Sequence, residues 1–310
     1  MKKIQSSLKA TVCMAAVALA AIGCSQDEWA EQSAPKGNTT IVASFDGADT
    51  RTSVNSNNNV VWNQNDAFGL FYTTQTSTTP SATEFSCPNA DGTSTTAVFS
   101  GTLDDGATTS YAVYPYQESM SLSNNTVTMK LPASFDYTTA SNGPMYAPAS
   151  DITKSISFKH LAGLLKLTVS SNIATEAKRF VITADKNIAG TCTADLSATA
   201  PELVVTSGDD ASTTITVNLS FNAEQTTPTT FYIPIPTGTY STLKAELQDN
   251  SGKALFPAKE WSNITVARAS MLTSSFGFIK IDATTPSDIT NKIAEVLPTE
   301  APAEPVTTNV

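Results

Sequence analysis

The side chains that could carry out acid–base or nucleophilic chemistry are few and scattered along the chain. His160 is the single histidine among the 310 residues. Beside a serine it could act as a general base, but serine is so abundant here that proximity means nothing, and no nucleophile elbow or triad context surrounds it. We therefore expect a half-buried histidine at the end of a strand, and we predict no catalytic residue.

Acidic residues occur in pairs next to single glycines, as at Asp104-Asp105 and Asp209-Asp210. A calcium loop needs oxygen ligands at alternating positions, so these pairs predict solvated turns. The glycines form no phosphate-binding loop, and no spacing of cysteine and histidine indicates a metal site. The sequence thus predicts no metal, no cofactor and no enzymatic activity, although it leaves open a pair of glycosidase carboxylates.

The surroundings of Cys24 indicate a covalent modification. Lys2, Lys3 and Lys9 precede an apolar run over residues 10–23 that ends directly at this cysteine, which is the pattern of an export signal. The run is too short for a membrane-spanning helix, which needs about 20 residues. Its end resembles the lipobox of bacterial lipoproteins, in which the cysteine becomes the acylated N-terminus and anchors the protein in the membrane. The alternative is an ordinary secretory peptide that ends by chance at a cysteine.

Composition limits the partners of the mature chain. Once the signal is removed, 15 basic and 28 acidic side chains remain, which is a net charge of −13. Such an acidic surface argues against nucleic acid as a partner. The hydrophobic content of 40% is enough for a packed core. An exported protein could pair Cys87 with Cys192, but two independent buried thiols are the simpler interpretation.

Residues 24–38 predict a flexible tether, and the segment that follows predicts an all-β body. Short β-branched or aromatic runs alternate there with turn residues, without a helical period. We expect strands at residues 40–45, 67–72, 97–100, 110–114, 126–131, 155–159, 164–170, 179–184, 202–206, 213–221, 229–235, 240–247, 262–267 and 274–281. This number suits two tandem antiparallel β-sandwiches of transthyretin-like or Greek-key topology.

A polar stretch after residue 170 divides the body into two predicted domains. We expect a signal peptide at 1–23, the tether at 24–38, an N-terminal sandwich at 39–170, a C-terminal sandwich at 171–281 and a last segment at 282–310. In this last segment Ser287 or Asp288 could cap a short helix. The prolines beyond it predict an extended tail.

Four short motifs follow one another in the first half of the body. They are Thr-Arg-Thr at residues 50–52, Val-Trp-Asn-Gln-Asn-Asp-Ala-Phe-Gly at 61–69, Tyr-Ala-Val-Tyr-Pro-Tyr at 111–116, and the segment 156–166. In order and spacing they resemble those of the fimbrillin-like pilin lipoproteins of Bacteroidetes. The acidic residues 25–28 also resemble the signal that sends lipoproteins of this phylum to the outer face of the cell. Large side chains at Trp62, Phe68, Leu70 and Tyr72 are expected to lie on one face of a sheet.

The resemblance implies assembly by strand addition. Fimbrillin-like pilins have two β-sandwich domains and polymerise after a protease removes the anchor and the first strand, so that a strand of another subunit fills the open groove. By this resemblance Arg51 is the processing site. The removable first strand consists of Thr40, Ile41, Val42, Ala43, Ser44 and Phe45, with Ile41, Ala43 and Phe45 on one face. The alternative makes Arg51 an ion-pair or loop residue, and the sequence favours that alternative.

The C-terminal end departs from that of a stalk pilin, because only residues 306–310 could add a strand after residue 281. We therefore expect a surface-exposed, lipid-anchored fimbrial subunit, accessory protein or anchor that acts in adhesion, in the outer membrane or in the fimbrium. Its partners would be other fimbrial subunits, outer-membrane lipid through acylated Cys24, and a ligand on a host or bacterial surface.

Two other functions stay open. A glycan-binding surface lipoprotein of a polysaccharide-uptake system would bind sugar with exposed aromatic platforms, and of Trp29, Trp62 and Trp261 only Trp261 is expected to be exposed in the body. A surface hydrolase ranks last, because the sequence offers no site for it.

Overall fold

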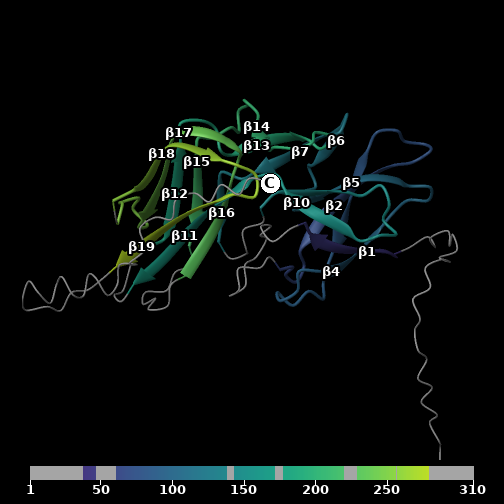
Figure 1. The fold of residues 1–310 in the computed structure, drawn as a ribbon, viewed down its shortest axis with the longest axis horizontal. Coiled ribbons are helices and arrows are strands. Elements are labelled where there is room, and N and C mark those ends of the chain that lie inside the picture. Colours follow the sequence, from purple (N-terminus) through teal and green to yellow (C-terminus); the bar gives the residue numbers. More distant parts are fainter. Residues whose placement is uncertain are drawn as a thin grey trace, which may run out of the picture. The chain divides into compact units, whose positions relative to one another are not determined.

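The computed structural model describes residues 38–46, 61–137, 143–171, 177–219, 229–255 and 257–278. Every regular element in these ranges is a β-strand, numbered β1 to β19, so the all-β prediction is confirmed (Figure 1). The signal peptide, residues 24–37 of the predicted tether, the predicted helix and the predicted C-terminal tail lie outside the described residues. Asn38, the last residue of the predicted tether, is instead the first residue of β1. No helix in the described ranges has the length and apolar character needed to cross a membrane.

Seven strands close into a barrel, in the order β1-β10-β9-β5-β2-β3-β4. Their bounds are β1 (Asn38–Phe45), β2 (Ala67–Thr73), β3 (Ser81–Ser86), β4 (Ala97–Thr102), β5 (Thr108–Tyr114), β9 (Met145–Pro148) and β10 (Ile156–His160). β1 closes the barrel by pairing with β4 on one side and with β10 on the other. The predicted sandwich of the first half is therefore, among the described residues, a barrel, because β1 joins two strands that would otherwise be sheet edges.

A four-stranded sheet of order β14-β13-β7-β6 covers part of the outer surface of the barrel. Its bounds are β6 (Ser121–Ser123), β7 (Thr126–Leu131), β13 (Gly190–Asp195) and β14 (Val204–Val205). The contact is apolar, since Phe71 and Val113 point outward from the barrel and pack among Leu122, Met129 and other side chains of this sheet. In this sheet β7 from the first half of the chain is hydrogen-bonded to β13 from the second half.

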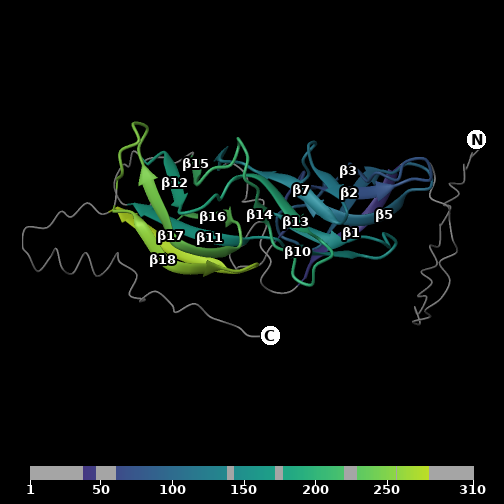
Figure 2. The same ribbon diagram turned by 90° about the horizontal axis from the view of Figure 1, so that it is seen from above.

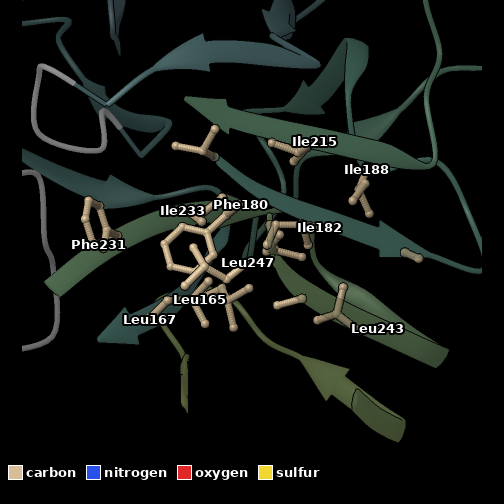
Figure 3. Packing of buried hydrophobic residues seen from close by; sticks show 14 of the residues in the cluster. Leu165, Leu167, Phe180, Ile182, Ile188, Ile215, Phe231, Ile233, Leu243 and Leu247 are labelled. Carbon is tan, nitrogen blue, oxygen red and sulfur yellow. The ribbon is translucent and has the colours of Figure 1, made fainter. Parts of the chain in front are cut away.

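The remaining strands form two sheets that face each other across an apolar core. One has the order β18-β17-β12-β15-β8 and the other β16-β11-β19. Their bounds are β8 (Ser134–Asp136), β11 (Gly163–Ser171), β12 (Arg179–Ala184), β15 (Thr214–Asn218), β16 (Thr229–Ile235), β17 (Gly238–Gln248), β18 (Lys259–Val266) and β19 (Met271–Phe278). Figure 2 shows β17 beside β18, and Figure 3 shows Phe180, Ile233 and Leu247 pointing into the shared core.

The sandwich arises from regular alternation along its strands. On β17, buried Leu243, Ala245 and Leu247 alternate with half-buried polar residues, so one face of the strand is apolar and the other is not. On β12 the buried residues are Phe180 and Ile182. Apolar side chains from both sheets interdigitate and remove each other from water, which supplies most of the stabilisation of such a core.

Three described strand pairs depart from the predicted antiparallel arrangement. β1 with β10, β11 with β19 and β15 with β8 are parallel. Their members are far apart in sequence, so no hairpin turn forces them to run in opposite directions. The predicted domain boundary falls at the end of β11, whose two partner strands both come from the second half. That boundary stays a prediction.

The prediction of large side chains on one face of a sheet is correct for Phe68 and Leu70, which lie on β2 and are fully buried in the barrel interior. Trp62 is fully buried in the same cluster but lies in the loop before β2. Tyr72 is half-buried near the end of β2 and is not part of the cluster in the barrel interior. Its hydroxyl donates a hydrogen bond to Asp104 Oδ2 at 2.9 Å.

Candidate functional site

The strand expected to be removable, residues 40–45, lies within β1. Ile41 and Ala43 point into the barrel and are 1% and 0% exposed, whereas Val42 between them is 41% exposed. Phe45 is half-buried and packs against the same interior cluster. The inward face of β1 therefore presents an aliphatic, a small and an aromatic side chain at every second position, as the period of a strand requires.

β1 changes partner along its length. Residues Asn38 to Ala43 pair antiparallel with β4, and residues Ala43 to Phe45 pair parallel with β10. Just after the strand, the Asp46 amide donates to the Phe158 carbonyl at 2.9 Å. Ala43 is thus the residue at which pairing passes from one neighbour to the other.

Trp62 lies beneath this changeover and is fully buried. Its indole Nε1–H donates a hydrogen bond to the Ala43 carbonyl at 3.2 Å. Its ring stacks on Phe45 with centroids 4.3 Å apart. It also meets, edge-to-face, three rings from the other walls of the barrel, namely Phe99 at 4.9 Å, Tyr114 at 5.6 Å and Phe158 at 5.6 Å. We call β4, β10 and Trp62 together the β1 seat.

The half-buried carboxylate of Asp66 supports the turn that carries Trp62. Asp66 Oδ2 accepts a hydrogen bond from the Asn63 amide at 2.8 Å, and Asp66 Oδ1 accepts one from the Tyr114 hydroxyl at 3.0 Å. Burial raises the pKa of Asp66 above its usual value, while these two hydrogen bonds oppose the rise. The nearby Cys87 amide donates to the Asp66 carbonyl at 3.0 Å. These bonds fix the loop from residue 61 to 66 to strand β5 and so orient Trp62.

The other residues considered from the sequence lie elsewhere. Cys24, Arg51 and Trp29 lie outside the described residues. His160 ends β10 as expected, but it is 2% exposed and hence more deeply buried than predicted, because the sheet over the barrel covers the chain next to it at Leu161. Trp261 is half-buried and packs against the sandwich core.

The two cysteines are buried, and members of the acidic pairs bind neighbouring side chains. Cys87 and Cys192 are both buried and not joined to each other, and burial raises the pKa of each thiol to about 12. Asp104 binds the Tyr72 hydroxyl. Asp210 accepts a hydrogen bond from Thr191 at 2.9 Å and pairs with Lys130 at 3.3 Å. In the ranges that the structure describes, no three His, Cys, Asp or Glu residues are grouped so as to hold a metal ion.

Known proteins place this chain in a family. A family model described as fimbrillin-like matches residues 50–274, which is more than half of the chain. The chain belongs to the fimbrillin-like family. The family indicates a fimbrial or adhesion-related protein at the cell surface or in a fimbria, with other fimbrial subunits as partners, and it is not a family of enzymes.

Solved structures resemble this fimbrillin-like chain over most of its length. A proposed cell adhesion protein from Bacteroides uniformis shares 15% identity and covers 80% of this chain and 94% of its own, with a TM-score of 0.46. One from Bacteroides ovatus shares 12% identity and covers 78% and 92%, with a TM-score of 0.46. The tip fimbrial protein Mfa3 from Porphyromonas gingivalis shares 12% identity and covers 73% and 81%, with a TM-score of 0.33. No curated protein matches the chain.

Sequence reasoning identified β1 but missed the contacts beneath it. The spacing of Ile41, Ala43 and Phe45 gave the inward face, and a small residue between two large ones was the available signal of close packing. The hydrogen bond from Trp62 to Ala43 had no signal, because a strand pattern does not tell which side chain lies under it. The role of Asp66 as acceptor for Tyr114 was likewise not expected.

Proposed function

We propose that this protein is a surface-exposed lipoprotein, anchored through acylated Cys24, that acts as a fimbrial subunit or as an accessory or anchor protein in adhesion. In this proposal, cleavage at Arg51 frees β1, and a strand of another subunit takes its place. The body consists of two β modules, the barrel closed by β1 and the sandwich. The partners are other fimbrial subunits and the lipid of the outer membrane.

The observation that carries the proposal is how β1 is bound in a fimbrillin-like chain. Within the described residues, β1 contributes Ile41, Ala43 and the half-buried Phe45 to the barrel core, while the fully buried rings come from other strands and from Trp62. Its two flanking strands would each offer a free edge after its departure, and a free edge is a template for adding a strand of another chain. Arg51 follows β1 by six residues in the sequence, so cleavage there would separate β1 from the rest of the barrel.

The glycan-binding alternative has little support. Sugar platforms are exposed aromatic side chains, whereas Trp62 is fully buried and Trp261 packs against the sandwich core. A hydrolase is not supported either, because His160 is buried at the end of β10.

The proposal is tested by N-terminal sequencing and intact mass of the protein recovered from cells, from the monomer and from any SDS-resistant oligomer. A start at Thr52 in the oligomer, together with a start at acylated Cys24 in the unprocessed monomer, is the expected result. The variant Arg51→Ala should block both the cleavage and the oligomer, and Arg51→Lys tests whether the protease requires arginine. Oligomers that begin at acylated Cys24 throughout would show that the first strand is not removed.

A further inference from the structure

Trp62 lies in the loop before β2 and not on β1. Its amide donates to the Ser94 carbonyl at 3.0 Å, and its carbonyl accepts from the Gly92 amide at 3.1 Å. Its edge-to-face ring contacts are with Phe99, Tyr114 and Phe158, which lie on β4, β5 and β10. These contacts do not depend on β1, so Trp62 would stay in place if β1 left.

β1 supplies Trp62 with a hydrogen-bond acceptor and with one aromatic ring. The indole N–H can only donate, and a buried donor without an acceptor loses its bond to water without replacement. In the intact barrel the Ala43 carbonyl is that acceptor, at 3.2 Å. The stacked ring is Phe45, at 4.3 Å. Any strand that replaces β1 must present a carbonyl and a ring at the same two places.

The position of Ala43 also limits the size of the replacing side chain. Ala43 is 0% exposed, and it lies among buried large residues of the barrel core. Interiors are packed at the density of crystals, so added atoms at such a place force neighbours out of their preferred positions. The outward position Val42 carries no such limit, because it is 41% exposed.

We infer that Trp62 makes the β1 seat selective for one kind of occupant, an extended strand of a fimbrial subunit with an aliphatic, a small and an aromatic residue at positions i, i+2 and i+4. This inference rests on the proposed replacement of β1 and adds the rule by which the replacing strand is recognised. Main-chain ladders with β4 and β10 bind any strand, and the side chains facing Trp62 decide which strand is retained. Trp62 is thus a specificity residue of the assembly site.

The first test uses the full mature chain, nicked once between residues 47 and 60 so that β1 stays seated without a covalent link. A dye on the thiol of unacylated Cys24 reports the release of the N-terminal fragment, at urea concentrations below the unfolding transition. Trp62→Phe keeps an aromatic ring but removes the donor, and we expect about fivefold faster release, since one hydrogen bond contributes roughly 1 kcal/mol. The matched control Trp261→Phe should release the fragment at the unaltered rate.

The second test replaces the released fragment with labelled peptides of residues 38–46. The natural peptide and its Val42→Leu variant should bind the vacated seat equally well. The Ala43→Leu and Phe45→Ala variants should bind at least about tenfold more weakly, because one overfills the site and the other removes the stacked ring.

Equal binding of the natural and Ala43→Leu peptides would overturn the inference, as would an unchanged release rate in Trp62→Phe or a fragment that leaves only when the whole protein unfolds. These failures are distinct from failure of the proposed function. Oligomers on cells that start at Thr52, combined with peptides bound without selectivity, would refute only the role of Trp62. Selective peptide binding combined with oligomers that start at Cys24 would refute only the proposed assembly.

Discussion

The barrel and the sandwich bury their apolar residues in different ways. The barrel interior is a set of touching rings, with Trp62 in contact with four others. The sandwich interior is mostly aliphatic, with leucine, isoleucine and valine from both sheets around Phe180 and Phe231 (Figure 3). In the barrel, aromatic rings from several strands meet at the centre. In the sandwich, each central strand supplies several buried side chains to the core.

This difference shows how a fold can contain a strand that adds little to the buried core. β1 adds two fully buried side chains, Ile41 and Ala43, of which one is only a methyl group. β12 in the sandwich adds Phe180, Ile182 and Ala184, and it is hydrogen-bonded on both sides over its whole length. A barrel filled from its other walls loses less on departure of one strand than a sandwich loses on departure of its central strand.

The largest expected effect compares one ring from each region. Phe180→Ala removes a fully buried ring and leaves a cavity, so we expect a loss of about 3–5 kcal/mol in the free energy of unfolding. Phe45→Ala removes a half-buried ring of β1 and should cost about 1–2 kcal/mol. Urea denaturation of the full mature chain measures both. The exposed Val204→Ala is the control and should change the free energy by less than about 0.5 kcal/mol. Equal losses for the two variants would mean that β1 contributes as much to the stability of the barrel as β12 does to that of the sandwich.

Hydrogen exchange gives a second comparison of the two strands, without mutation. Amide protons of β1 can exchange by release of that strand alone, while those of β12 require the sandwich to open. We therefore expect the protected amides of Ile41 and Ala43 to exchange roughly 100-fold faster than that of Ile182. Exchange followed by mass spectrometry or NMR at neutral pH measures this ratio. Equal rates would mean that β1 opens only when the whole body unfolds.

Much of this fold was predictable, because strands in which apolar and polar residues alternate regularly can be recognised in the sequence. The runs at 40–45, 126–131 and 179–184 coincide with β1, β7 and β12 almost residue for residue. β13 was missed because its inward residues are Gly190, Cys192 and Ala194, which are too small to stand out as an apolar pattern. Short strands such as β6 and β8 give too few residues for any period to appear.

The closure of the barrel and the contacts in it could not be derived from local pattern. β1 and β10 are paired although Ala43 and Ile156 are far apart in the chain. No turn chemistry links them, and a parallel pair leaves no hairpin signal. For the same reason the sequence showed that Trp62 and Ala43 are core residues but not that one donates a hydrogen bond to the other.

A third comparison uses two buried tyrosines, one in each region. Tyr114 in the barrel donates to the carboxylate of Asp66 at 3.0 Å, and Tyr240 in the sandwich donates to the Pro236 carbonyl at 2.7 Å. Tyr114→Phe should cost about 1–3 kcal/mol at neutral pH, because the half-buried carboxylate of Asp66 loses a hydrogen-bond donor. Tyr240→Phe should cost about 1 kcal/mol, since its acceptor is neutral.

The pH dependence separates the two tyrosine variants further. Burial raises the pKa of Asp66 in the folded chain above the usual 3.8, so the folded protein binds this proton more tightly than the unfolded chain does. Stability from this group is therefore present at low pH and is lost as pH rises through the raised pKa. Tyr114→Phe removes a bond to the ionised form, so its cost should shrink as pH falls toward 3.8 and Asp66 binds a proton. The cost of Tyr240→Phe should stay constant over the same range, and urea denaturation at several pH values measures both. A cost of Tyr114→Phe independent of pH would show that Asp66 keeps one charge state throughout.

The smallest expected effect concerns the ion pair at the end of β1. Lys159 Nζ lies 3.1 Å from Asp46 Oδ2, and both side chains are about half exposed. Water and salt screen such a pair, so Lys159→Ala should lower the free energy of unfolding by less than about 0.5 kcal/mol, and the difference should vanish in 1 M salt. Lys244→Ala, which breaks the 2.8 Å pair with Glu246 in the sandwich, is the matched control and should behave alike. In the nicked chain, Lys159→Ala should change the release of β1 by less than about twofold. Release as fast as in Trp62→Phe would mean that this exposed ion pair retains β1 as strongly as the Trp62 indole does. Retention of β1 would then depend on surface charge as much as on the aromatic interior of the barrel.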